Sequence, residues 1–377
     1  MKTLCLLGFL TVAQARTVPS MNEAMAAAIA AQEIAGAVTL VANADRTLHL
    51  AAHGHADLET QTPMRDDTLF WIASMTKPIT AAAVMMMQDA GKLSVDDPVS
   101  KFLPEFKELK DHRGKKVIIT LKHCLTHSSG LREVSSEESG DITTLADLMP
   151  LIVAQPLEFA PGTRWQYSQT SINTAARIVE VVSGQSFPDF LEKRLFAPLG
   201  MKDSTFYPNL EQTRRLANSY THTPDGNLEK APLMFLGKAP LSSRERYPRA
   251  NGGLFSTASD YAKFSRMLLR GGELDGKRYL SKNAVREMTR IQSGDLITGF
   301  TPGNGWGLGC CVVREPQGPS AALSSGSFGH GGAYGTQAWI DPVKQRVHIL
   351  LVQRANFPNS DASSLRQAFH EAAALLP

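Results

Sequence analysis

The chain has 377 residues, of which 43% are hydrophobic and 20% are charged, and its formal net charge is +3. This length is enough for one large domain or for two interlocked ones. The charge is small and no long basic block is present, which argues against nucleic acid as the main partner. After the first fifteen residues no apolar stretch is long enough to span a bilayer, so stable membrane insertion is not expected.

The first fifteen residues predict a signal peptide rather than part of the fold. Lys2 is the basic start, residues 4–12 form the apolar centre, and Ala13-Gln14-Ala15 is a small-residue cleavage site. A frayed N-terminal segment is the alternative interpretation. The sequence therefore predicts an exported protein, periplasmic or secreted, that is cleaved near Ala15.

Cysteine usage argues against a disulfide framework. After cleavage the chain would keep Cys124, Cys310 and Cys311. Adjacent cysteines rarely bridge each other, and an odd number leaves at least one free thiol.

Taken in order, the elements place strands at both ends of the chain and helices in the middle. We expect a helix over residues 21–33 with Ser20 as its N-cap, and a hairpin of strands 36–42 and 47–54. Residues 145–200 predict mostly helices, and the clearest of these cover 171–182 and 187–196. Residues 211–249 are polar and rich in turn residues, and they support no assignment. The last part predicts a helix over 258–269, strands over 306–313, 334–340 and 346–352, and a helix over 363–375.

This order predicts the α/β class, more specifically an α+β fold. Its antiparallel sheet would be built from both termini and flanked by helices, with a mostly helical insertion between them. We expect a sheet subdomain over residues 16–80 and 250–377 and a helical subdomain over residues 81–249.

The first candidate site is the stretch from Phe70 to Lys77, which places a serine and a lysine three residues apart. Residues at this spacing share one face of a helix, so Ser74 and Lys77 can touch. Pro78 fixes the position of the helix, because proline is tolerated in the first turn and is costly further in. Ser74 therefore lies within about one turn of a helix N-terminus, and this helix is expected to run to residue 89 or 90. A serine beside a lysine at the head of a buried helix is a known arrangement for a nucleophile.

A serine nucleophile needs a proton acceptor, an oxyanion hole and a proton donor for the leaving group. Lys77 can accept a proton only if its pKa falls well below its ordinary value of about 10.4, as burial would cause. A second motif, Tyr167-Ser168-Gln169, offers a phenol that can relay a proton. A third, His330-Gly331-Gly332-Ala333, is rich in small residues, which is typical of a strand edge that approaches a ligand closely.

With these three motifs in this order, the chain resembles the superfamily of serine β-lactamases and penicillin-binding proteins. Within it the chain is most similar to class C β-lactamases, D-alanyl-D-alanine carboxypeptidases and family VIII carboxylesterases. The resemblance covers nearly the whole chain after residue 15, and it implies a β-lactamase/transpeptidase-like fold. It also extends to three flanking segments, residues 91–98, 125–131 and 252–257.

The resemblance implies a role for each residue of the site. Ser74 would be the acylated nucleophile, and Lys77 and Tyr167 would share the general-base role. The backbone N–H groups of Ser74 and Ala333 would form the oxyanion hole. The substrate-binding residues would be Gln169, His330, Gly331 and Gly332. No cofactor and no metal are implied, and the expected partner is a small ester or amide substrate. The oligomeric state is not indicated.

Two departures from the family pattern bear on the substrate. Gln169 stands where the second motif often has asparagine, and His330-Gly331-Gly332 replaces a lysine, a hydroxyl residue and a glycine. This loss removes a fixed positive charge suited to the carboxylate of β-lactams and peptidoglycan stems, which favours neutral esters. A histidine can still be cationic at mildly acidic pH, so a β-lactamase or D-alanyl-D-alanine carboxypeptidase stays the alternative. A non-catalytic binding protein on the same fold is a third interpretation.

Two groups of histidines have spacings that could bind a metal. His49, His53 and His55 point to one face of the predicted strand, but no acidic or cysteine partner lies nearby. His123 and His127 lie four residues apart, as helical ligands do. His127 belongs to a family-like segment, so we expect a structural hydrogen-bonding role there.

Overall fold

The computed structural model of the chain describes residues 18–135, 137–140, 142–233, 236–237, 239–299, 301–357 and 362–377. The predicted signal peptide over residues 1–15 lies outside these described residues. Within them, no helix has both the length and the apolar character that a membrane crossing requires.

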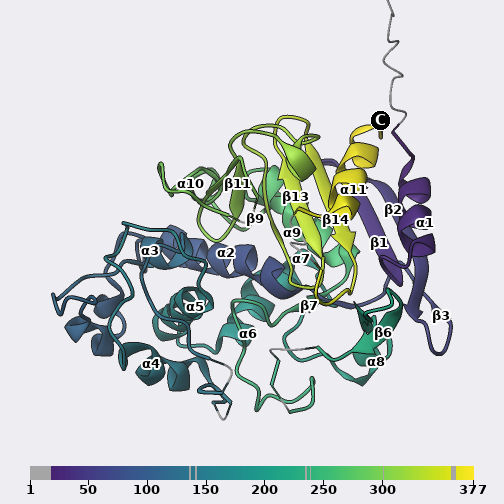
Figure 1. The fold of residues 1–377 in the computed structure, drawn as a ribbon. Coiled ribbons are helices and arrows are strands. Elements are labelled where there is room, and N and C mark those ends of the chain that lie inside the picture. The colour runs from purple at the N-terminus through teal and green to yellow at the C-terminus, as the bar shows by residue number, and fades with distance from the viewer. Residues whose placement is uncertain are drawn as a thin grey trace, which may run out of the picture.

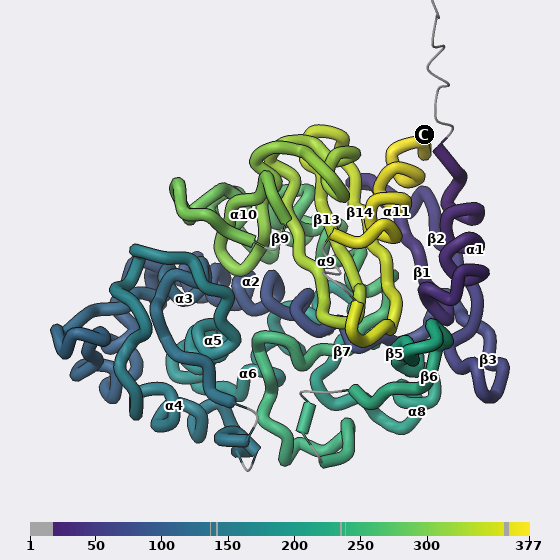
Figure 2. The backbone as a smooth tube through the Cα atoms, in the orientation of Figure 1, coloured from purple at the N-terminus to yellow at the C-terminus, as the bar shows by residue number. Residues whose placement is uncertain are grey.

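An eight-stranded antiparallel sheet joins the two ends of the chain. Its strand order is β10-β11-β12-β13-β14-β1-β2-β3, so N-terminal and C-terminal strands meet between β1 and β14. In that pair Val38 lies opposite Leu351. Figures 1 and 2 show the purple N-terminal strands beside the yellow C-terminal ones. The predicted antiparallel sheet built from both termini is confirmed. The strands are β1 (Gly36–Ala42), β2 (Thr47–Asp57), β3 (Thr62–Pro63), β10 (Asn304–Trp306), β11 (Cys311–Val313), β12 (Phe328–Gly331), β13 (Gln337–Asp341) and β14 (Arg346–Leu351).

Helices cover both faces of this sheet. Alternate side chains of β1 point to opposite faces and contact different helices. Ala37 and Val41 point to one face, where they pack with α1 (Met21–Ala30) and α11 (Ser364–Ala374). Val38 and Leu40 point to the other face and join the main core, beside α9 (Ala258–Leu269). Because both faces are covered, every residue of β1 is buried. Ser20 caps α1 as predicted, since its hydroxyl accepts a hydrogen bond from the backbone N–H of Glu23.

A group of helices lies beside the sheet in Figure 1, and helix α2 (Thr76–Asp89) connects it to the strands. All residues from Thr76 to Met87 are buried, which fits a run that is apolar on every side. α2 packs against α5 (Gln169–Ser183) on one side and α10 (Lys282–Thr289) on another. The start of α2 therefore lies between the sheet and the helices. The boundaries of the two predicted subdomains, at residues 80 and 250, stay a prediction.

The other elements are short. The helices are α3 (Leu121–Leu125), α4 (Leu145–Val153), α6 (Phe187–Leu191), α7 (Ala197–Leu199) and α8 (Leu210–Arg214), and a π-helical turn (Glu192–Phe196) joins α6 to α7. The small strands are β4 (Phe70–Trp71), β5 (Ser219–His222), β6 (Leu228–Ala231), β7 (Phe255–Ser256), β8 (Glu273–Leu274) and β9 (Lys277–Arg278). Short 3-10 turns lie at Ala73–Met75, Val99–Lys101, Pro104–Glu108 and Gly318–Ser320.

Two predicted strands are wrong in extent. The stretch 306–313 is two strands, β10 and β11, which pair antiparallel across a turn. Gly309 lies in this turn with a φ of +67°, and an added Cβ there would lie 2.9 Å from the carbonyl oxygen of Lys77. The turn therefore presses against helix α2, where only glycine fits. The predicted strand 334–340 begins later, at Gln337, because Gly335 makes a turn with a φ of +88°.

The segment that supported no assignment, residues 211–249, begins within α8 and also contains the hairpin of β5 and β6. The hairpin is polar on one side and extends the sheet region through Tyr220. The Tyr220 N–H donates to the carbonyl of Gln353, and its hydroxyl accepts from the N–H of Leu58. Contacts to distant parts of the chain hold this hairpin, so its own sequence gives little sign of it.

Candidate active site

Ser74 lies in the 3-10 turn Ala73–Met75, directly before helix α2. Pro78 is the third residue of α2, where its missing N–H leaves no helical hydrogen bond unmade, as predicted. Ala73 has a φ of +45°, a conformation that costs a non-glycine residue about 1–3 kcal/mol. Two hydrogen bonds hold this turn, since the Thr76 hydroxyl donates to the Ala73 carbonyl at 2.6 Å and the Ile72 N–H donates to the Leu254 carbonyl at 3.0 Å.

Lys77 is fully buried and its ammonium nitrogen has three acceptors. Nζ lies 2.9 Å from Ser74 Oγ, 2.8 Å from Gln169 Oε1 and 2.7 Å from the backbone oxygen of Asn251. Burial lowers the pKa of Lys77 to about 7, although the negative charge of Glu133 acts in the opposite direction. A large part of Lys77 is therefore neutral at neutral pH.

The geometry orients neutral Lys77 toward Ser74. Amide oxygens only accept hydrogen bonds, so the two N–H bonds of a neutral amine go to Gln169 and Asn251. The lone pair of Nζ is then left for the hydroxyl proton of Ser74. Lys77 is thus placed as a proton acceptor.

Three side chains from this part of the chain hold a turn that follows Arg249. Trp71, Lys77 and Thr80 donate to the successive carbonyls of Gly252, Asn251 and Ala250, at 2.6, 2.7 and 2.6 Å. The side chain of Asn251 also donates to Gln169 Oε1 at 2.9 Å. The supporting turn of residues 249–253 and the second motif are therefore parts of one hydrogen-bonded frame around Lys77.

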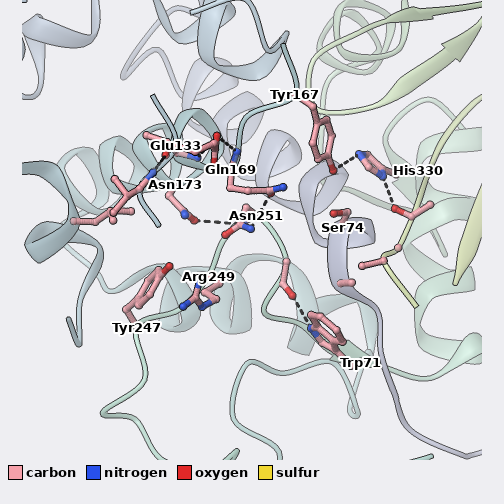
Figure 3. Close-up of a pocket in the computed structure, with 18 of the residues that line it drawn as sticks. Trp71, Ser74, Glu133, Tyr167, Gln169, Asn173, Tyr247, Arg249, Asn251 and His330 are labelled. Carbon is pink, nitrogen blue, oxygen red and sulfur yellow. Dashed lines mark hydrogen bonds between the residues drawn. The ribbon is translucent and has the colours of Figure 1, made fainter. Parts of the chain in front are cut away.

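Tyr167 and His330 meet on another side of Ser74 (Figure 3). His330 Nδ1 lies 2.6 Å from the carbonyl of Gly331, which only accepts, so Nδ1 carries the proton and donates. His330 Nε2 is then the acceptor for the hydroxyl of Tyr167 at 3.4 Å. Lys77 Nζ lies 4.6 Å from the centre of the Tyr167 ring. The structure therefore brings together Ser74, Lys77, Tyr167 and His330 from three distant motifs.

His330 is neutral in this environment. Burial and the nearby Lys77 lower the pKa of His330 to about 3. The interpretation that this histidine is cationic at mildly acidic pH is wrong, because a charged imidazole would lose its hydration and lie near another cation.

His127 has the structural role predicted for it. Its Nδ1 accepts a hydrogen bond from the backbone N–H of Ser168 at 3.0 Å, and its ring packs against Tyr167 at 4.6 Å between centroids. The rings of Trp165 and Trp306 complete this cluster. These ring contacts fix the orientation of the Tyr167 ring.

The end of strand β12 lies against the Ser74 turn. A Cβ added to Gly332 would lie 2.6 Å from the carbonyl oxygen of Ile72, so only glycine permits this approach. It places Ala333 on the cavity that Ser74 also lines. Within the described part of the chain, neither the Ser74 N–H nor the Ala333 N–H donates to another group. Both are free for a developing oxyanion, and the oxyanion-hole assignment stays a prediction.

The cavity has a volume of about 470 Å³. It is lined by every residue assigned to the site except Lys77, which contacts the lining residue Ser74. Sequence reasoning missed several of its lining residues, which are Trp71, Glu133, Asn173, Tyr247, Arg249 and Asn251. Asn251 was detectable, because it precedes a glycine pair that resembles the family. Glu133 lies at the start of helix α5, where its Oε1 accepts from the N–H of Gln169 at 2.7 Å, and burial raises its pKa.

The histidines considered as metal ligands have other partners. His49 and His53 both lie within hydrogen-bond distance of the Thr39 hydroxyl, at 2.8 and 3.0 Å. His123 Nδ1 accepts from the N–H of Thr120 at the start of α3. Among the described residues there is no group of three histidine, cysteine or acidic side chains that could hold a metal ion.

Comparisons with known proteins identify the family of the chain. The family model described as Beta-lactamase matches residues 21–373. Esterase EstB of Burkholderia gladioli is 30% identical over 360 residues, which cover 87% of this chain and 88% of that protein. Penicillin-binding protein 4 of Amycolatopsis lactamdurans is 30% identical over 295 residues, which cover 78% of this chain and 73% of that protein. Among solved structures, the chain is similar to EstCE1, described as a hydrolase with promiscuous acyltransferase activity. That similarity has a TM-score of 0.79 and 25% identity, and it covers 94% of this chain and 97% of that one.

The low pKa of Lys77 predicts a specific dependence of stability on pH. The unfolded chain keeps this amine protonated up to about pH 10.4, whereas the folded chain releases the proton near pH 7. Between these values the unfolded state binds more protons, so the free energy of unfolding rises with pH. In urea titrations from pH 7 to pH 9.5, the free energy of unfolding of wild type should rise by about 1.4 kcal/mol per pH unit relative to that of Lys77→Met. Parallel curves for the two proteins would contradict the buried, deprotonated lysine.

Proposed function

The chain belongs to the β-lactamase family, and we propose that it is a serine hydrolase that cleaves small carboxylic esters through an acyl-enzyme on Ser74. The observation that carries the proposal is the contact of 2.9 Å between the buried Lys77 amine and Ser74 Oγ, on the floor of a cavity of about 470 Å³. The similarity to esterase EstB over 87% of the chain supports it. The nucleophile, the proton acceptor, the proton donor and the oxyanion-binding N–H groups of the mechanism all come from this chain.

In the acylation step, Ser74 Oγ attacks the carbonyl carbon of the ester and neutral Lys77 accepts the hydroxyl proton. The N–H groups of Ser74 and Ala333 stabilise the oxyanion that forms. The bond from the carbonyl carbon to the alcohol oxygen then breaks, and Tyr167 gives its proton to the departing alkoxide. Lys77 passes its proton on to Tyr167, which restores both groups.

In the deacylation step, water replaces the alcohol as the second reactant. The Lys77–Tyr167 pair removes a proton from the water as it attacks the acyl carbonyl. The tetrahedral intermediate collapses, the carboxylic acid leaves, and Ser74 Oγ regains a proton. His330 accepts a hydrogen bond from Tyr167, and His127 packs on its ring, so both orient the phenol.

The third motif supports esters over β-lactams or peptide stems. His330 is neutral, so strand β12, which ends at Gly331, offers no fixed cation to a substrate carboxylate beside Tyr167. An ester also needs less help with its leaving group than an amide does, since an alkoxide is a better leaving group than an amine anion. The similarity to penicillin-binding protein 4 keeps a β-lactamase or D-alanyl-D-alanine carboxypeptidase as the second candidate.

Replacing the nucleophile tests the proposal directly. Ser74→Ala should reduce hydrolysis of 4-nitrophenyl acetate and butyrate to background, because no acyl-enzyme can form. Circular dichroism and thermal unfolding serve as controls that the variant is folded. A chromogenic cephalosporin and a D-alanyl-D-alanine peptide, assayed in parallel, should be cleaved far more slowly by wild type than the esters.

A fluorophosphonate probe should label wild type at Ser74 and leave Ser74→Ala unlabelled. Absence of a Ser74 adduct in a folded wild-type protein would favour the non-catalytic binding protein. Fast turnover of the cephalosporin or the peptide, beside slow ester cleavage, would favour the second candidate.

A Tyr167→Phe variant separates the two candidates for the general base. With Lys77 as the base, kcat/KM of wild type rises with pH around a midpoint near 7, because the neutral amine is the active form. Tyr167→Phe should lower the rate by about 100-fold or more and keep this midpoint. If the rise near pH 7 disappears in the variant, the titration belongs to the coupled pair or to Tyr167. Esters with a good leaving group, such as 4-nitrophenol, should be affected less than alkyl esters.

We also propose that the protein is exported. The basic start at Lys2, the apolar run 4–12 and the segment Ala13-Gln14-Ala15 support a cleaved signal peptide. Expression of the full chain in a Gram-negative host should yield periplasmic protein whose intact mass corresponds to a start at Arg16. A protein that keeps residues 1–15 and stays in the cytoplasm would contradict export.

A further inference from the structure

The cavity contains a second basic side chain that the mechanism does not use. Arg249 lines it together with Ser74, Tyr247 and Asn251. Arginine stays charged in proteins, so the cavity carries a permanent positive charge that neither Lys77 nor His330 supplies at neutral pH.

This guanidinium has no anionic partner in the described part of the chain. Its guanidinium carbon lies over the ring of Tyr247, 4.5 Å from the ring centre. Burial lowers the pKa of Arg249, and only Tyr247 opposes that effect. The other charge on the cavity wall, Glu133, is hydrogen-bonded to the N–H of Gln169, and Figure 3 shows it well apart from Arg249. A partly desolvated cation without a counter-ion is costly, so a ligand that pairs with it gains binding energy.

The position of Arg249 is fixed by the same frame that holds the catalytic amine. Its carbonyl accepts hydrogen bonds from the N–H groups of Gly252 and Gly253, at 2.8 and 2.6 Å. Two residues later, the carbonyl of Asn251 accepts from Lys77. The ring of Tyr247 lies under the guanidinium and supports it through a cation–π contact. Little conformational freedom is therefore lost when the guanidinium binds a ligand.

Arg249 lies on the acyl side of the cavity. In Figure 3 the side chains of Tyr167 and His330 lie on one side of Ser74, and those of Tyr247 and Arg249 lie on the opposite side. In the proposed mechanism Tyr167 protonates the leaving group, so the alcohol portion faces Tyr167. The acyl chain of the substrate must then extend toward Tyr247 and Arg249.

We propose that Arg249 binds a carboxylate at the far end of the acyl group, so the preferred substrates are monoesters of short dicarboxylic acids. This inference rests on the proposed ester hydrolysis. The planar fork of arginine suits a carboxylate, which it binds through two parallel N–H···O bonds. A cavity of about 470 Å³ holds a short chain of this kind. The inference is compatible with the loss of the third-motif cation, because that cation would lie on the opposite side of Ser74.

The test compares two esters that differ only in the terminal group of the acyl chain. Phenyl hydrogen adipate ends in a carboxylate, and phenyl hexanoate has the same number of acyl carbons and ends in a methyl group. The ratio of their kcat/KM values, followed by release of phenol, measures the preference for the anion. Arg249→Leu should lower this ratio at least about tenfold, the size expected for a hydrogen bond to a charged group.

Phenyl hexanoate is the reference substrate for each variant, so a general loss of activity cancels in the ratio, and circular dichroism with thermal unfolding checks that each variant is folded. Arg249→Lys keeps the charge without the fork and should recover part of the preference. Arg244→Gln is the matched control, since Arg244 lies on the same segment, stacks on Tyr207 and does not line the cavity. It should leave the ratio unchanged. A wild-type ratio near one, or a ratio that Arg249→Leu does not alter, would overturn the inference while ester hydrolysis stands.

A binding measurement separates this inference from the proposed activity. Ser74→Ala binds without turnover, so calorimetric titration with monomethyl adipate and with dimethyl adipate reports recognition alone. The monoanion should bind at least about tenfold more tightly than the neutral diester, and Ser74→Ala/Arg249→Leu should lose this difference. If no ester is hydrolysed but this difference is present, the proposed function fails and the anion site stands. Equal binding of the two compounds would overturn the anion site.

Discussion

The buried amine of Lys77 is the interaction on which the rest of the site depends. A lysine removed from water must satisfy its donors within the protein, and in its charged form Lys77 donates to Ser74, Gln169 and Asn251. These partners come from three separate parts of the chain. The requirement to satisfy one nitrogen therefore ties the turn before α2, the start of α5 and the supporting turn 249–253 into one unit. Burial, which makes this requirement strict, also lowers the pKa of the amine to about 7 and turns it into a base.

The supporting turn explains how the cavity receives its two basic groups at fixed positions. Trp71, Lys77 and Thr80 hold three successive carbonyls of this turn, and Arg249 begins it. Lys77, the proposed base, and the guanidinium of Arg249 are thus held by the same hydrogen-bonded frame. Tyr167 is held from the other side by His127 and His330. In the proposed mechanism, the leaving-group side of the cleft is neutral and the acyl side carries the positive charge of Arg249, so electrostatics would set the substrate preference.

Much of this arrangement could be predicted from local sequence. The spacing of Ser74 and Lys77, with Pro78 after them, depends on helix geometry alone, and the structure has the helix in that place. The strands of the sheet were predicted where alternation or an apolar run was clear, as in β1 and β14. The stretch 306–313 was predicted wrongly, since the apolar pattern continues through a turn that Gly309 makes against helix α2. A pattern of apolar residues reports burial and does not report a change of direction.

The sequence by itself determined which groups are available for the proposed reaction. The available chemistry follows from the side chains, because reactivity belongs to them. Here they are a serine and a lysine at helical spacing, a tyrosine and a glycine-rich strand. Only the tertiary structure decided the charges. Lys77 is partly neutral because it is buried, and His330 is neutral because it is buried with Lys77 nearby. Arg249 faces the cavity with Tyr247 as its partner because the chain turns there. Protonation and pairing depend on desolvation and on neighbours that are distant in sequence. Ser74 could therefore be proposed as the nucleophile from the sequence, whereas the charged end of its cleft could not be predicted.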